Sequence, residues 1–138
     1  MKNDVIRIGK VSSVNAAAGM VRVTYPDKDD SVTAELPVFS FTGEYRMPEV
    51  GSQVLVAHLS NGTAAGICLG AYWNKSAPPP VSSGFRKDLG SGAYIECADG
   101  QVVIHASNII LDGITNINGL DFSTHTHTGV NGETSGPH

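Results

Sequence analysis

The chain has 138 residues, of which 41% are hydrophobic, so it can bury a core in one domain or in two small ones. Nine Lys and Arg against thirteen Asp and Glu give a formal net charge of −4. This balance disfavours general nucleic-acid binding, because such surfaces need clustered basic residues. No apolar run approaches the roughly 20 residues of a membrane span, and the first residues lack the apolar segment of a secretory signal. We therefore expect assembly in a cytoplasm.

The first 75 residues carry the pattern of five short strands. Short β-branched runs alternate with Gly, Asn, Asp and Pro, and no segment keeps the three-to-four-residue apolar period of a helix, so we predict an all-β fold. We expect strands over 5–14, 20–25, 32–36, 53–59 and 64–72, with a long loop over 37–51. Five short strands in this length fit a small Greek-key barrel such as an OB-fold. The sequence predicts an OB-fold domain over residues 1–75.

We predict structural roles for one histidine and both cysteines, although their side chains are chemically reactive. His58 lies inside the apolar strand predicted over 53–59, so we expect a residue of the barrel and not a metal ligand. Cys68 and Cys97 have apolar neighbours and no metal-binding or disulfide spacing. We predict that both are small buried hydrophobic residues.

A proline-rich segment separates the predicted barrel from the rest of the chain. Residues 76–84 contain three consecutive prolines, Pro78–Pro80, which favour a stiff polyproline conformation. We predict a linker over 76–84 and a domain boundary within it.

Residues 85–122 carry two apolar series in which the members are seven residues apart, Ile95, Val102 and Ile109 in the first, and Cys97, Ile104 and Leu111 in the second. Because residues two apart on a strand face the same way, the two series predict short strands and turns that share one apolar side. A unit this small has too little core to fold alone. Several chains wound together would bury the apolar side in a continuous axial core, so we predict that residues 85–122 associate with other copies of the chain; the family resemblance given below implies that they form a trimeric intertwined β-helix. Asn116 and Asn118 interrupt the pattern, which indicates either polar groups on the axis or a different strand register.

The last segment, residues 123–138, holds the sharpest motif, His125-Thr126-His127. In an extended chain both imidazoles lie on one side. One chain supplies too few ligands for a secure metal site, but three chains on a threefold axis would supply six, which suits an octahedral ion such as Fe(II), Ni(II) or Co(II). The alternative is a pair of surface histidines in a polar tail.

Residues 125–137 resemble the tip of the phage baseplate assembly protein V family, the central spikes of contractile tails. The segments 47–54 and 66–70, together with Pro78–Pro80, are similar to the OB-fold module of that family. The resemblance implies a homotrimer whose OB domains bind the baseplate hub and whose apex, residues 123–138, meets the target cell envelope at the tip of the virion tail. It also implies one iron ion per trimer, held by His125 and His127 of three chains. The expected function is that of a structural membrane-piercing spike, without enzymatic activity.

Two other classes of function remain as alternatives. An OB-fold binder of nucleic acid or oligosaccharide with a trimerising tail would use exposed aromatics such as Phe39, Phe41, Tyr45 and Trp73, but it would also need cations. A metal-dependent hydrolase would need an open coordination position and a general base, for which Glu133 is the nearby carboxylate after the histidine pair.

Overall fold

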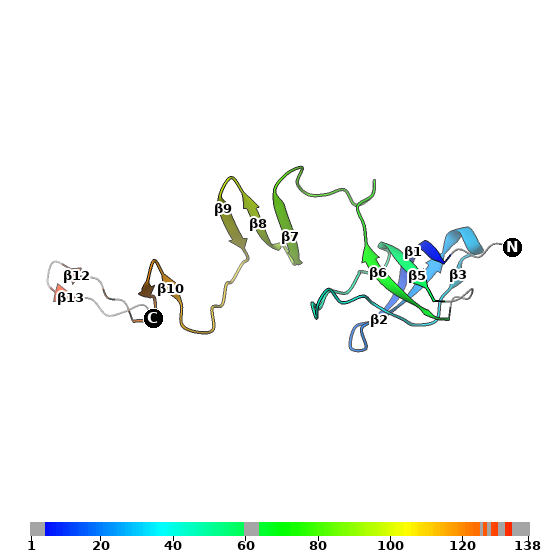
Figure 1. Ribbon diagram of the computed structural model, residues 1–138, viewed down its shortest axis with the longest axis horizontal. Helices are drawn as coiled ribbons and strands as arrows, with labels where there is room; N and C mark the ends of the chain where they lie inside the picture. Colours follow the sequence, from blue (N-terminus) through cyan, green and yellow to red (C-terminus); the bar gives the residue numbers. More distant parts are fainter. Residues whose placement is uncertain (1–4, 60–63, 125, 127, 130–131, 134–138) are drawn as a thin grey trace. The chain divides into compact units, whose positions relative to one another are not determined.

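The computed structural model describes residues 5–59, 64–124, 126, 128–129 and 132–133. Within these residues the regular structure is all β apart from one short 3-10 turn, η1 (Pro26–Lys28) (Figure 1). The expectation of an all-β fold is therefore confirmed. In the same part of the chain, no helix is long and apolar enough to cross a membrane.

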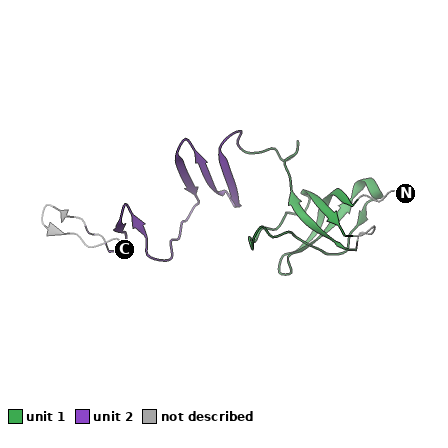
Figure 2. Cartoon of the chain, viewed as in Figure 1, with its two compact units in different colours: residues 1–80 green, residues 81–138 purple. Residues whose placement is uncertain are grey.

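The chain divides into two compact units, residues 1–80 and 81–138, and each is described by itself (Figure 2). The division falls inside residues 76–84, the segment with the three prolines. Unit 1 holds the strands predicted for the barrel. Unit 2 holds the two apolar series and the C-terminal segment.

Unit 1 is a small closed barrel. Its strands are β1 (Ile6–Asn15), β2 (Met20–Tyr25), β3 (Ser31–Val32), β4 (Leu36–Pro37), β5 (Gln53–His58) and β6 (Gly66–Ala71). The sheet order is β3-β2-β1-β5-β6, and β4 pairs with β2. A parallel bridge between Val38, just after β4, and Cys68 of β6 closes the sheet, with a 2.8 Å hydrogen bond from the Phe39 amide to the Cys68 carbonyl. This closure gives the strand order of the expected OB-fold.

The barrel core follows from strict alternation along the strands. Every second residue of β2 and β5 points inward, which buries Val21, Val23, Val54 and Val56. Gly9 of β1 is required for closure, because a Cβ there would lie 2.5 Å from Cγ1 of Val23 and 2.7 Å from a backbone oxygen. The rest of the buried apolar core is Val11, Tyr25, Leu36 and Cys68.

The strand predicted over 32–36 is interrupted, and Thr33 is the reason. Its side chain is buried, and its Oγ1 accepts a hydrogen bond from the Val23 amide at 3.0 Å, while its own amide donates to the Val23 carbonyl. The threonine side chain therefore replaces one backbone partner in the ladder. The predicted strand divides into β3 and β4 on either side of it.

His58 is part of the barrel interior, as predicted. It is 3% exposed, and its Nδ1 lies 3.0 Å from the carbonyl oxygen of Ala65. Gly66 allows this close approach, because a Cβ there would lie 2.6 Å from a backbone oxygen. The thiols of Cys68 and Cys97 are both free, and Cys68 is buried as predicted. Cys97 is only half-buried, which differs from the prediction, because unit 2 provides no core around it.

Unit 2 consists of small antiparallel pieces. A three-stranded sheet has the order β7-β8-β9, formed by β7 (Phe85–Gly90), β8 (Ala93–Ala98) and β9 (Gln101–His105). The hairpins β10 (Asn116–Ile117) with β11 (Leu120–Asp121), and β12 (Thr128–Gly129) with β13 (Gly132–Glu133), follow. Residues 106–115 contain no strand. The strand expected at Ile109 and Leu111 is therefore absent from the single chain.

Tight turns with a left-handed residue before a glycine set the register of unit 2. Ser91, Asp99 and Asn118 have φ of 52°, and each precedes a glycine that also has positive φ. Such pairs match the right-handed twist of the flanking strands in two-residue hairpin turns. Asn118 is thus a turn residue, and it does not occupy an apolar layer. Of the two interpretations offered for this asparagine, the structure favours a register different from the predicted one.

Candidate functional site

Unit 2 has no core of its own in the single chain. None of residues 81–124 and 126 is buried. Twelve of its large hydrophobic side chains are exposed: Phe85, Leu89, Val102, Val103, Ile104, Ile109, Ile110, Leu111, Ile114, Ile117, Leu120 and Phe122. Monomeric soluble proteins rarely expose apolar surface on this scale, and larger patches mark interaction sites. This surface is the first candidate site of the molecule.

One side of the β7-β8-β9 sheet is mainly apolar, with Lys87 opposite Ile95 as its charged residue, and the register shows how the two apolar series meet there. Ile95 lies opposite Ile104, and Cys97 lies opposite Val102. Phe85 lies opposite Cys97 on the other flank. We call these five residues, Phe85, Ile95, Cys97, Val102 and Ile104, the apolar sheet face. The sequence predicted correctly that the two series share a side, but the nearest neighbours come from different series.

Polar and aromatic side chains occupy the opposite side of the same sheet. The Arg86 guanidinium lies 2.9 Å from Glu96 and 3.1 Å from Asp88, and it also stacks 3.8 Å from the centroid of the Tyr94 ring. The Tyr94 ring stacks on His105 with centroids 4.8 Å apart. Hydrogen bonds to Glu96, and to a smaller extent to Asp88, raise the pKa of Arg86. This side of the sheet therefore stays charged. The sheet is therefore amphipathic, with one side suited to water and the other to a partner.

Sequence reasoning missed this polar side and the strand β7 that supplies Arg86. The signal was present in Gly90-Ser91-Gly92, which forms the turn between β7 and β8. A turn of this type implies a strand on each side of it.

Beyond the sheet the apolar side chains continue without cover. Ile110 is 80% exposed and Ile114 is 83% exposed, and both lie in the strandless segment 106–115. Exposure of these apolar side chains to water is unfavourable, and the segment lacks the sheet pairing that would hold them on one side. This segment therefore resembles a strand whose pairing partners would come from neighbouring chains.

The predicted metal ligands, His125 and His127, lie outside the described residues, as does His138. The described neighbours Thr124 and Thr126 are exposed. Among the described residues, His, Cys, Asp and Glu form no group of three that could hold a metal ion. The imidazole donors of this pair suit a transition metal, and the metal site remains a prediction.

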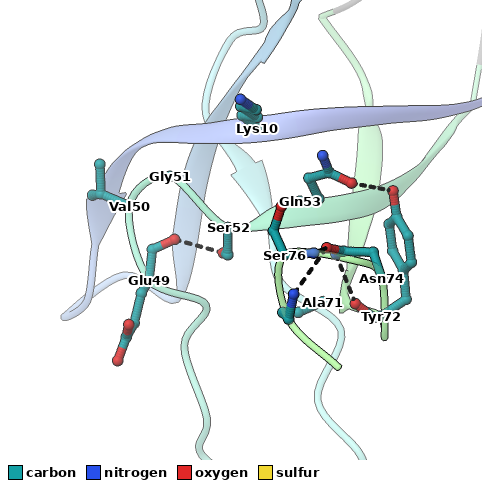
Figure 3. A pocket seen from close by; sticks show the side chains of 11 residues that line it. Lys10, Glu49, Val50, Gly51, Ser52, Gln53, Ala71, Tyr72, Asn74 and Ser76 are labelled. Carbon is teal, nitrogen blue, oxygen red and sulfur yellow. Dashed lines mark hydrogen bonds between the residues drawn. The ribbon is translucent and has the colours of Figure 1, made fainter. Parts of the chain in front are cut away.

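The barrel carries a shallow pocket of about 280 Å³ (Figure 3). It lies between the place where Lys10 of β1 pairs with Gln53 of β5 and the turn after β6. Its polar groups bond to one another. Tyr72 donates to Oε1 of Gln53 at 2.8 Å, and Oδ1 of Asn74 accepts from the amides of Ser76 and Ala77. Lys10 and Glu49 are its charged lining residues. The arrangement stabilises the start of the linker and offers no converging set of ligand donors.

Exposed aromatic rings of the barrel are the feature that a nucleic-acid or sugar binder would use. Phe39 and Phe41 pack edge to face with centroids 6.2 Å apart, and both are at least half exposed. Trp73 is 65% exposed. Two of the unit's cations are engaged within the barrel, since Arg7 lies 5.3 Å from the Tyr25 ring centroid and Arg22 donates to the Thr33 carbonyl.

Comparison with known proteins identifies the barrel. Residues 7–73 match the family model of the type VI secretion system/phage-baseplate injector OB domain. The match begins in β1 and ends just after β6, so it covers the closed barrel. A comparison with curated proteins gives no match.

Proposed function

Since this chain belongs, through residues 7–73, to the family of type VI secretion system and phage-baseplate injector OB domains, we propose that it is the central spike of a contractile tail or a related injector. The family gives the chain a structural, baseplate-related role. The finer assignment, a homotrimeric membrane-piercing spike at the tip of the tail, is our inference.

The observation that carries the proposal is the lack of any buried residue over 81–124 and at 126, together with the twelve exposed large hydrophobic side chains of unit 2. Burial of apolar surface is worth about 25 cal/mol per Å². Three copies that turn their apolar sheet faces and the segment 106–115 toward a common axis would gain this energy. The charged side with Arg86, Asp88 and Glu96 would then face solvent.

The mechanism would be mechanical. Contraction elsewhere in the particle supplies the work, and the spike transmits the force. Strands wound around one another resist separation, because pulling them apart breaks many backbone hydrogen bonds at once. His125 and His127 of three chains would supply six imidazoles to one metal ion. Iron is the first candidate for that ion. That ion would hold three chain ends together in a point too narrow for side-chain packing.

Within this proposal the OB barrel contacts the baseplate hub, and the C-terminal apex meets the cell envelope. The balance of charge in the barrel supports a protein contact over a nucleic-acid contact. Its described part holds six Lys and Arg (Arg7, Lys10, Arg22, Lys28, Arg46 and Lys75) and six Asp and Glu (Asp27, Asp29, Asp30, Glu35, Glu44 and Glu49).

The test is the mass of the purified full chain in solution. We expect sedimentation equilibrium to give three times the 14.4 kDa chain mass. A stable monomer at micromolar concentration would contradict the spike proposal. Binding of single-stranded DNA at physiological salt, with salt dependence, would instead favour the OB-fold binder.

A further inference from the structure

The outer side of the barrel carries a second apolar surface, formed by residues of unit 1 alone. β5 lies between β1 and β6 in the sheet (Figure 1). At one end of β1 and β5 the outward residues are polar, since Lys10 pairs with Gln53. Toward the other end the residues that alternate with the core are apolar as well: Ile6, Ile8, Leu55, Ala57, Ile67 and Leu69. We call this set the outer barrel face.

The strand register joins five of the six residues, and Leu69 lies at the register shift between β5 and β6. Ile6 pairs with Ala57, which pairs with Ile67, and Ile8 pairs with Leu55. Side chains directly opposite one another on one face of a sheet are in contact range. Ile6 is 64% exposed, Ile8 is 54% exposed and Leu69 is 45% exposed. An ordinary antiparallel sheet with one solvated face places polar residues at these positions, so the apolar set needs an occupant.

We propose that the outer barrel face is an interface between copies of this chain, in which neighbouring barrels of the trimer pack against one another. This inference rests on the proposed trimer.

The small area of the outer barrel face limits which partner can bind it. Three strands about 4.8 Å apart, with about four residues of about 3.4 Å along each, give an area of roughly 200 Å². A stable contact between two independent proteins buries about 800 Å² on each partner. A free protein would therefore gain too little from this face to bind it. Only an occupant that is already held close by can fill it.

Copies of this chain meet that condition. The thirteen residues 72–84 separate β6 from β7, so they reach at most about 45 Å when fully extended. Once three copies of unit 2 associate, each barrel is tethered within this distance of the associated units, which gives the barrels an effective concentration in the millimolar range. The absence of charge among the six residues fits a permanent contact, because permanent interfaces are more apolar than transient ones.

The experiment places a reporter thiol on the face of the full-length protein. Ile8→Cys is made in a Cys97→Ala background, in which buried Cys68 is the native thiol that remains. Asp27→Cys, on the exposed turn η1, is the matched control. Reaction with a water-soluble maleimide is timed on preparations whose mass has been measured by sedimentation. Ile67→Cys, on the neighbouring strand β6, is a second reporter in case Ile8→Cys disturbs the barrel.

We expect both reporters to react at least tenfold more slowly than Asp27→Cys in the trimer. In a dissociated chain, obtained with Ile104→Lys, the rates should agree within about threefold. A trimer in which Ile8→Cys and Ile67→Cys react as fast as in the dissociated chain would overturn this inference and leave the spike proposal intact. A monomer in the parent protein would overturn both.

Discussion

The hydroxyl of Tyr25 donates a hydrogen bond to Nε2 of His58, at 2.6 Å, inside the barrel. The direction follows from the other ring nitrogen, because Nδ1 faces the carbonyl oxygen of Ala65 and must carry the proton. The chain Tyr25, His58, Ala65 thus ties β2 to β5 and to the start of β6. Burial raises the pKa of Tyr25 to about 12, from an ordinary value of 10.0.

The burial of the Tyr25 hydroxyl predicts a stability loss at high pH. The unfolded chain releases the tyrosine proton near pH 10, while the folded barrel retains it until about pH 12. The contribution is therefore fully present below pH 10 and is lost as the pH rises to 12, by about 3 kcal/mol at most. Urea unfolding between pH 8 and pH 12 should show this loss of stability in the parent. The Tyr25→Phe variant should lack the part of the loss that comes from the titration of Tyr25.

The same variant should cost about 1 to 3 kcal/mol at pH 7, because Nε2 of His58 is left buried without a donor. Tyr45→Phe is the control, since its 71% exposed ring donates only to a surface carbonyl. Equal pH profiles for Tyr25→Phe and the parent would contradict the assignment of the titration to Tyr25.

Assembly should depend on which side of the β7-β8-β9 sheet is changed. Ile104→Lys places a charge on the apolar sheet face of each copy, and an unpaired buried charge costs several kcal/mol. We expect the trimer to weaken at least a hundredfold in sedimentation. Val103→Lys, one residue earlier, lies opposite Glu96 on the charged side and should leave the trimer intact. Dissociation by both variants alike would contradict the orientation of the sheet.

Metal content should depend on the C-terminal histidine pair. We expect about one metal ion per three chains by elemental analysis of untagged protein, and none in the double variant His125→Ala, His127→Ala. The double variant should remain trimeric, because the apolar surface of unit 2 supplies most of the burial. His105→Ala, which removes a ring stacked on Tyr94, should keep the metal. One ion per chain would argue for a different site.

The two thiols should report separately on folding and on assembly. Burial raises the pKa of Cys68, so its thiol should resist alkylation in every folded preparation. Cys97 lies on the apolar sheet face and should be protected only in the trimer. Mass spectrometry after iodoacetamide treatment should therefore find Cys97 modified in Ile104→Lys and unmodified in the parent. Rapid modification of Cys97 in the parent trimer would place that face outside the interface.

The sequence by itself determined most of the barrel and the need for partners. The alternation in Met20–Tyr25 and Gln53–His58 is a local property, and it sets which side chains point inward wherever the strands pack. The excess of apolar residues after Pro80 also needs no coordinates to be recognised, because a segment of that size cannot bury them alone.

Tertiary structure decided what depends on pairing between distant residues. The apolar series seven residues apart predicted a shared side, but the turn at Asp99 and Gly100 made Ile95 the neighbour of Ile104 and not of Val102. The partner of His58 was equally hidden, because Tyr25 lies 33 residues earlier and reaches it only across the closed barrel. Strand register and barrel closure join residues by hydrogen bonding across space, and a one-dimensional spacing rule does not contain that information.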